Sequence, residues 1–281
     1  MTTNASTKKT SNLTNPLTRG LMSCIFLITL APLASSATLV SETFDAGETF
    51  TGWYWNNGFY QNPPSFGMAW NQSSTSSQFF TTSFSSQTLA PGDSLSVSFN
   101  YQANSTNINT VRVGLFSGTA ATANDWDQWD NTTPALSSTW KGYSANLRLA
   151  AGEVELRETS TANAHPFFGG SALETDADVT FGATGDIRAA RFSLENVGGS
   201  ITLSLEEGAN FATLSNVYTI TDSVDPMTSG FNILSFYMTT DTGNGDIRYD
   251  NITVSAIPEP GTLVMALVGL SAVVLFRKRH K

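Results

Sequence analysis

The sequence predicts an all-β fold, an antiparallel β-sandwich of the jelly-roll type, on three observations. Apolar and polar residues alternate with a period of two in several segments, which gives each predicted strand one apolar face. Turn residues such as glycine and asparagine separate those segments. No segment has the apolar spacing of an amphipathic helix. About ten to thirteen strands without helices fit two packed antiparallel sheets.

The predicted strands follow one another through residues 38–256. In chain order, the alternating segments are 94–101, 143–149, 154–156, 192–205 and 234–254. Gly198-Gly199 interrupts the fourth segment and Asn244-Gly245 the last, and both pairs predict β-hairpins. Because neither a repeat nor a clear linker interrupts these residues, we expect one sandwich domain.

The charge distribution separates the middle of the chain from its ends. Charged residues are only 13% of the 281 residues, whereas hydrophobic residues are 40%. Of the 14 Lys and Arg, three precede Thr38 and four follow Pro260, which leaves seven against 23 acidic residues and a net charge of −16. Such a domain repels nucleic acid and anionic lipid and attracts cations, so we expect no nucleic-acid partner.

The N-terminal residues 1–37 predict a secretion signal. A basic region without acidic residues precedes the apolar run Leu21–Leu33. Small residues then lead to an expected cleavage between Ala37 and Thr38. The alternative is a membrane anchor, which needs about 20 apolar residues, and this run is shorter.

The C-terminal residues 257–281 combine three features in order. The motif Pro258-Glu259-Pro260 comes first, the apolar run Thr262–Phe276 follows, and the basic cluster Arg277–Lys281 ends the chain. The prolines exclude regular secondary structure, so we expect the motif to be extended and exposed. The apolar run predicts a short hydrophobic helix inserted in the membrane, with the basic cluster on the cytoplasmic side. A plain membrane anchor predicts the same topology.

This tail resembles the PEP-CTERM sorting signal of Gram-negative bacteria, with the motif at Pro258, Glu259 and Pro260. The resemblance implies that an exosortase, a membrane cysteine transpeptidase, recognises and cuts the tail after transient membrane insertion. It also implies a role in exopolysaccharide, biofilm or floc. The chain would be the substrate of the sortase, held in the membrane before its tail is processed.

Signals of catalysis are weak. The sole cysteine, Cys24, lies within the apolar run of the secretion signal, which argues against a lipoprotein site and leaves the mature domain without thiols. One histidine, His165, would remain, too few for a typical zinc site, and no Gly-x-Ser-x-Gly occurs. Carboxylates that qualify by type for glycoside hydrolysis are Glu153, Glu155, Glu158, Glu206 and Glu207. A solvated strand face explains them more simply, so we expect no enzymatic activity.

Two aromatic clusters are candidates for sugar stacking. Trp126 and Trp129 lie within the acidic segment Asp125–Asp130, and exposed indoles stack on the apolar faces of sugar rings. Trp53 and Trp55 form the second cluster together with Tyr54 and Tyr60. Packing in the core is the alternative for both.

The segments Glu42–Gly47 and Ile247–Val254 resemble the first and last strands of jelly-roll carbohydrate-binding modules. That resemblance implies that the two strands lie together and share a structural calcium ion. The carboxylates that would hold it are Glu42, Asp45 and Asp250. Alternation places Asp250 on the buried face of its strand, where a carboxylate needs a partner. Pairing with Arg248 or capping of a turn is the alternative.

Together these features predict an exported, non-enzymatic protein of the bacterial cell surface or extracellular matrix, which binds polysaccharide or has a structural role there. The alternatives are a secreted polysaccharide-active enzyme that uses a carboxylate pair and a purely structural adhesin.

Overall fold

The computed structural model describes residues 35–44, 52–55, 59–61, 68–72, 78–103, 110–119, 139–149, 151–160, 166–167, 170–176, 179–239 and 245–259. They belong to a compact unit that spans Ser35–Glu259. The predicted secretion signal up to residue 34 and the apolar run after residue 259 lie outside the described residues. None of the described residues forms a helix long and apolar enough to cross a membrane.

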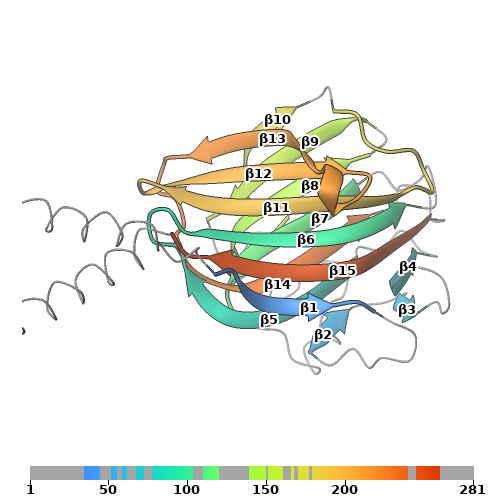
Figure 1. Cartoon of the computed structure of the whole chain (residues 1–281), viewed down its shortest axis with the longest axis horizontal. Coiled ribbons are helices and arrows are strands. Elements are labelled where there is room, and N and C mark those ends of the chain that lie inside the picture. The colour runs from blue at the N-terminus through green and yellow to red at the C-terminus, as the bar shows by residue number, and fades with distance from the viewer. Residues whose placement is uncertain are drawn as a thin grey trace, which may run out of the picture. The chain divides into compact units, whose positions relative to one another are not determined.

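Two antiparallel sheets form the unit (Figure 1). Sheet A has the order β13 (Ser215–Asp222), β12 (Ser200–Gly208), β11 (Ile187–Val197), β6 (Ser94–Ala103), β15 (Gly245–Ile257), β4 (Met68–Gln72), β3 (Phe59–Gln61), and β1 (Ala37–Glu42) also pairs with β15. Sheet B has the order β10 (Ser171–Asp176), β9 (Glu153–Thr159), β8 (Lys141–Arg148), β7 (Thr110–Ser117), β14 (Ser229–Thr239), β5 (Gln78–Thr88), β2 (Trp53–Trp55). The short 3₁₀ helix η3 (Phe211–Thr213) follows β12. The predicted all-β sandwich is therefore confirmed.

Aromatic side chains join the inner faces of the two sheets. Every second residue of β6 from Leu95 to Ala103 is buried, as the alternation predicts. Phe99 of β6 meets Phe236 of β14 edge to face, with ring centroids 5.1 Å apart, and Phe236 also contacts Tyr249 of β15. These contacts bury apolar area from three strands of two sheets at one point of the core.

Part of the outer face of sheet B is buried as well, which the alternation did not predict. Seven consecutive residues of β7 are buried, from Thr110 to Phe116. A second apolar cluster accounts for part of this burial, and its members are Phe79, Phe116, Trp140, Phe167, Ile233 and Tyr237. Arg112 lies over the ring of Tyr237, 5.1 Å from its centroid. Burial lowers the pKa of Arg112 to about 10, so its guanidinium stays charged at neutral pH.

One of the two predicted hairpins is correct and the other is wrong. β11 and β12 pair in continuous register around Gly198-Gly199, as expected. β14 and β15, however, lie in different sheets, so Asn244-Gly245 does not connect a hairpin. The Asn-Gly signal is local, whereas the strand partners are set by core contacts far away in sequence.

A β-bulge in β15 corrects the prediction for Asp250. Asp250 is opposite Asn100 and Thr253 is opposite Ser98, so β15 has one extra residue between these pairs. Asn251 lies in this bulge and has a left-handed φ of 49°. Tyr249 and Ile252 therefore both face the core, and Asp250 is only half-buried rather than on the buried face.

Replacement of Phe99 by alanine tests the central packing. The variant should lose about 3–5 kcal/mol of unfolding free energy, because a fully buried ring leaves a cavity between the sheets. Urea denaturation measures the loss. Ser96→Ala, on the outer face of the same strand, is the control and should change stability by less than about 0.5 kcal/mol. Equal losses in the two variants would contradict the assigned faces of β6.

Candidate functional site

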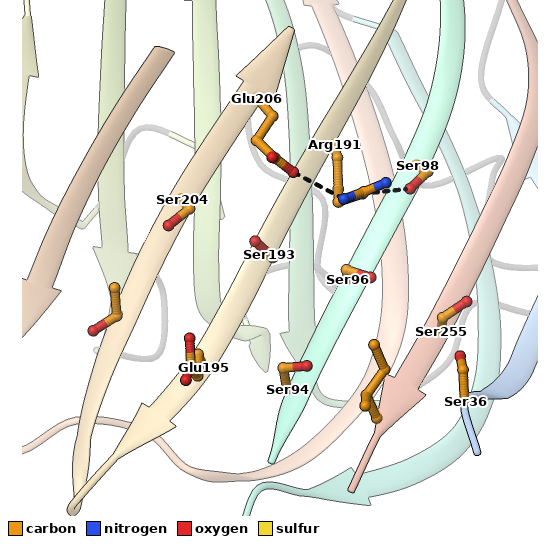
Figure 2. A pocket seen from close by; sticks show the side chains of 12 residues that line it. Ser36, Ser94, Ser96, Ser98, Arg191, Ser193, Glu195, Ser204, Glu206 and Ser255 are labelled. Atoms are coloured by element: carbon orange, nitrogen blue, oxygen red, sulfur yellow. Dashed lines mark hydrogen bonds and ion pairs between the residues drawn. The ribbon is translucent and has the colours of Figure 1, made fainter. Parts of the chain in front are cut away.

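The outer face of sheet A has rows of hydroxyl groups. Along β6 the outward residues are Ser94, Ser96 and Ser98, which alternate with the buried apolar ones. The strand register places hydroxyls side by side on five neighbouring strands, in the row Thr219, Ser204, Ser193, Ser96, Ser255. Figure 2 shows Ser204, Ser193, Ser96 and Ser255 of this row on one face. Neighbouring strands lie about 4.8 Å apart, so the row is regular.

An ion pair lies beside this row. Arg191 on β11 contacts Glu206 on β12, with Nη1 and Oε2 3.1 Å apart, and its Nε donates to the Ser98 hydroxyl at 3.3 Å (Figure 2). The two charged side chains are 40% and 27% exposed, so water screens the pair and its contribution to stability is small. Its effect on the surface is to cancel both charges locally.

Two adjoining hollows follow this face. One has a volume of ≈ 370 Å³ and the other of ≈ 590 Å³, and they share Ser98 and Arg191. We call them together the hydroxyl trough. It is lined by Ser36, Ser41, Glu42, Thr43, Ser94, Ser96, Ser98, Asn100, Arg191, Ser193, Glu195, Thr202, Ser204, Glu206, Phe211, Asn251, Thr253, Ser255 and Ile257. Phe211 in η3 is 38% exposed and provides an aromatic ring at the larger hollow.

The hydroxyl trough is not among the sites that the sequence predicted. The alternating serines of β6 predicted only the polar face of a strand whose other face is buried. A usable signal was present, because outward positions of several predicted strands are Ser or Thr in a chain with few charges. The register that aligns these strands is not local, so the sequence alone did not place them together.

The predicted aromatic sites are not assembled by the described residues. Trp126 and Trp129 lie outside the described residues, as does His165. Trp53 is only 5% exposed and stacks on Phe80, with ring centroids 4.1 Å apart. This position corrects the prediction for Trp53, because a ring that stacks on a sugar needs an exposed face and Trp53 is buried in the core. Of Trp55, only its place opposite Phe80 in the β2–β5 ladder is described.

The predicted calcium ligands already have hydrogen-bond donors. Glu42 accepts from the Phe44 amide and from Trp53 Nε1, both at 3.2 Å. Asp250 accepts from the backbone and side-chain nitrogens of Asn251, at 2.8 and 3.2 Å. Among the described residues no three acidic or other metal-ligating side chains gather around one point. Asp45 lies outside them, so the calcium site stays a prediction, and Glu42 and Asp250 alone do not form one.

Arginines neutralise most of the candidate catalytic carboxylates. Glu153 and Glu206 contact Arg148 and Arg191, at 2.8 and 3.1 Å. Glu155 contacts Arg157 and Arg148, and Glu207 contacts Arg188 and accepts from the Tyr101 hydroxyl. Of the five candidates, only Glu158 has no arginine partner among the described residues.

Glu158 lies near a buried carboxylate at the rim of the core. Asp222 is 4% exposed and accepts from the Tyr143 hydroxyl at 2.8 Å. Desolvation raises the pKa of Glu158, and the nearby charges of Asp222 and Asp225 raise it further. The ionised form of Glu158 therefore destabilises the folded state.

The two predicted processing sites lie next to each other. β1 pairs with the end of β15, with Ala37 opposite Ala256 and Thr38 opposite Ser255. The first and last strands thus lie together, as the resemblance to carbohydrate-binding modules implies. Pro258 and Glu259 follow the last residue of β15, Ile257, directly. Glu259 is exposed, but its amide donates to Asp93 Oδ1 at 2.8 Å.

Residues 256–279 match the family model described as the PEP-CTERM protein-sorting motif. The chain carries a PEP-CTERM sorting motif. This motif marks an exported surface protein that is held in the membrane and then processed by an exosortase. The match begins within β15, so the PEP-CTERM motif and the sandwich share Ala256 and Ile257.

A solved carbohydrate recognition domain shares the fold of the sandwich. The carbohydrate recognition domain of Emp47p superposes with a TM-score of 0.51 at 9% identity, over 79% of this chain and 95% of that one. The potassium-bound form of the Emp46p domain has a TM-score of 0.49 at 8% identity, over 78% and 96%. Basic winged bean lectin with Tn-antigen has 0.49 at 11% identity, over 79% and 98%. At such identities the likeness is one of fold. No curated protein sequence matches the chain.

Replacement of Glu158 by glutamine should remove one pH-dependent contribution to stability. A carboxyl whose pKa is raised by folding favours the folded state at low pH, and this contribution is lost as the pH rises through the folded pKa. The variant should therefore melt at a higher temperature than the wild type at pH 7, and the difference should vanish near pH 4. Glu195→Gln, an exposed side chain on β11, controls for the loss of one charge. A lower melting temperature for Glu158→Gln at pH 7 would contradict the unfavourable environment assigned to the ionised Glu158.

Proposed function

We propose that this exosortase-sorted surface protein binds neutral polysaccharide in the hydroxyl trough of sheet A. The observation that carries the proposal is the row of outward hydroxyls on five aligned strands, beside a neutralised ion pair. Hydroxyl groups both donate and accept hydrogen bonds, which matches the alternating donors and acceptors of a sugar chain. An open trough across a sheet suits an extended polymer rather than an enclosed small ligand.

Charge and aromatic chemistry support a neutral ligand. Residues 38–260 have a net charge of −16, so a polyanion would be repelled before it reached the surface. Within the trough, Arg191 is already paired with Glu206 and offers no free cation to an acidic sugar. Phe211 is placed to stack on a sugar ring at the larger hollow. The Emp47p domain, which shares the fold, is itself a carbohydrate recognition domain.

The proposed role is non-enzymatic and lies at the cell surface or in the extracellular matrix of a Gram-negative bacterium, within exopolysaccharide or biofilm. Four of the five candidate catalytic carboxylates form ion pairs with arginine, and the trough has no pair of free acids at its centre. Glycoside hydrolysis needs one protonated and one ionised carboxyl on opposite sides of the bond that is cut. An arginine partner stabilises the ionised form of a carboxyl, so it does not suit the one that must be protonated.

A glutamate introduced in the middle of the trough should strongly weaken polysaccharide binding. Ser96→Glu and Ser193→Glu add bulk and negative charge on adjacent strands, and each should weaken the retention of neutral polysaccharides at least tenfold in affinity electrophoresis. Ser83→Glu, at an exposed serine of β5 in sheet B, makes the same change elsewhere and should bind as the wild type does. Unchanged binding by the trough variants would move the ligand to another surface. Retention of uronic-acid polymers instead of neutral ones would contradict the proposed ligand class.

The processing of the chain can be measured by its intact mass after export from the native host. The mature protein should begin at Thr38 and lack the residues that follow the motif Pro258–Pro260. Glu259→Ala should leave the tail uncut and the protein in the membrane fraction, because the motif is what the sortase recognises. An exported protein that still contains Arg277–Lys281 would contradict sorting by this route.

A further inference from the structure

The described part of the sorting motif is attached to the sandwich. Ile257 pairs with Ser94 as the last rung of the β15–β6 ladder. Two residues further on, the Glu259 amide donates to Oδ1 of Asp93, the residue that precedes Ser94. The Asp93 side chain thus takes the place of a backbone acceptor and extends the ladder into the motif.

The turn of residues 90–93 contacts Glu259 through Asp93 and Gly92. The second oxygen of Asp93, Oδ2, accepts from the Ala90 amide at 2.9 Å, so one carboxylate fixes both the turn and the motif. Gly92, with φ of 92°, lies directly against the Glu259 side chain. A Cβ at position 92 would be 2.6 Å from Cγ of Glu259, so the positive φ and this close contact both favour glycine here.

The β11–β12 hairpin forms hydrogen bonds with the same turn. Asn196, which is 3% exposed, exchanges backbone hydrogen bonds with Gly92 and Asp93, at 2.6 and 3.0 Å. Its side chain donates to the Leu89 carbonyl and accepts from the Gly199 amide. We call Ala90, Gly92 and Asp93 the motif clasp. It is complete only when β6, β11, β12 and β15 are folded.

We propose that the motif clasp restrains the sorting motif and so slows its processing by the exosortase. A transpeptidase must take the chain on both sides of the cut into an extended groove, where backbone groups bind the enzyme. The Glu259 amide cannot bind Asp93 and such a groove at once. The exosortase can then process only those molecules in which Pro258–Glu259 has detached. Its apparent affinity for the chain is lowered in proportion to the fraction of such molecules. The inference depends on sorting and not on polysaccharide binding.

Release of the clasp should accelerate processing of the full-length chain in its host. Asp93→Ala removes both acceptors, and tail loss in a pulse-chase experiment should become about fivefold faster, the effect of one lost hydrogen bond. A Gly-Ser-Gly-Ser insertion between Ile257 and Pro258 should do the same while the turn stays intact. Asn210→Ala, which removes a similar side-chain cap at η3, is the control and should process at the wild-type rate.

The insertion variant decides the outcome if Asp93→Ala folds poorly. Hydrogen exchange of the full chain in detergent should show the Glu259 amide protected in the wild type and unprotected in the insertion variant. If the insertion variant is processed at the wild-type rate, the proposal that the clasp slows processing is wrong. If it is processed more slowly, the clasp instead helps to present the motif to the exosortase, which also contradicts the proposal. If the wild-type tail is never cut, sorting itself fails, which is a separate result.

Discussion

The last strand of the sandwich, β15, is the element on which both the core and the proposed site depend. It lies inside sheet A, with β6 along one side and β1 and β4 along the other. Its inward residues Tyr249, Ile252 and Val254 are buried, whereas Thr253 and Ser255 face the hydroxyl trough. Because β15 is the last described strand in the sequence, sheet A is incomplete without it. The proposed ligand face and the attachment of the sorting motif therefore both require β15.

The sequence predicted those features that short segments determine. The alternation from Leu95 to Tyr101 was enough for β6, and the linear order of motif, apolar run and basic cluster was enough for the sorting signal. Long-range pairing was not predictable in the same way. Asn244-Gly245 indicated a hairpin where the strands belong to different sheets, and the extra residue at Asn251 turned Asp250 away from the core. The hydroxyl trough combines residues of β1, β6, β11, β12 and β15, so its existence depends on the register between strands that are far apart in sequence.

The two faces of the sandwich differ in a way that supports the proposed role. On the outer side of sheet B, aromatic rings, Arg112 and Glu155 are buried, so that face contributes to stability. The outer side of sheet A stays open and has small hydroxyl residues where a soluble protein usually has Lys or Glu. These outward hydroxyls contribute little to the stability of the domain. Their regular donors and acceptors match a ligand that also has many hydroxyl groups, as proposed above.

A nuclear magnetic resonance titration with oligosaccharides from a neutral polysaccharide that the protein retains tests this account most directly. We expect the largest amide shifts on β6, β11 and β15, around Ser96, Ser193 and Ser255, and no comparable shifts on β8 or β9 of sheet B. Shifts confined to sheet B or to the loops at its edge would contradict the central claim that the outer face of sheet A is the ligand surface.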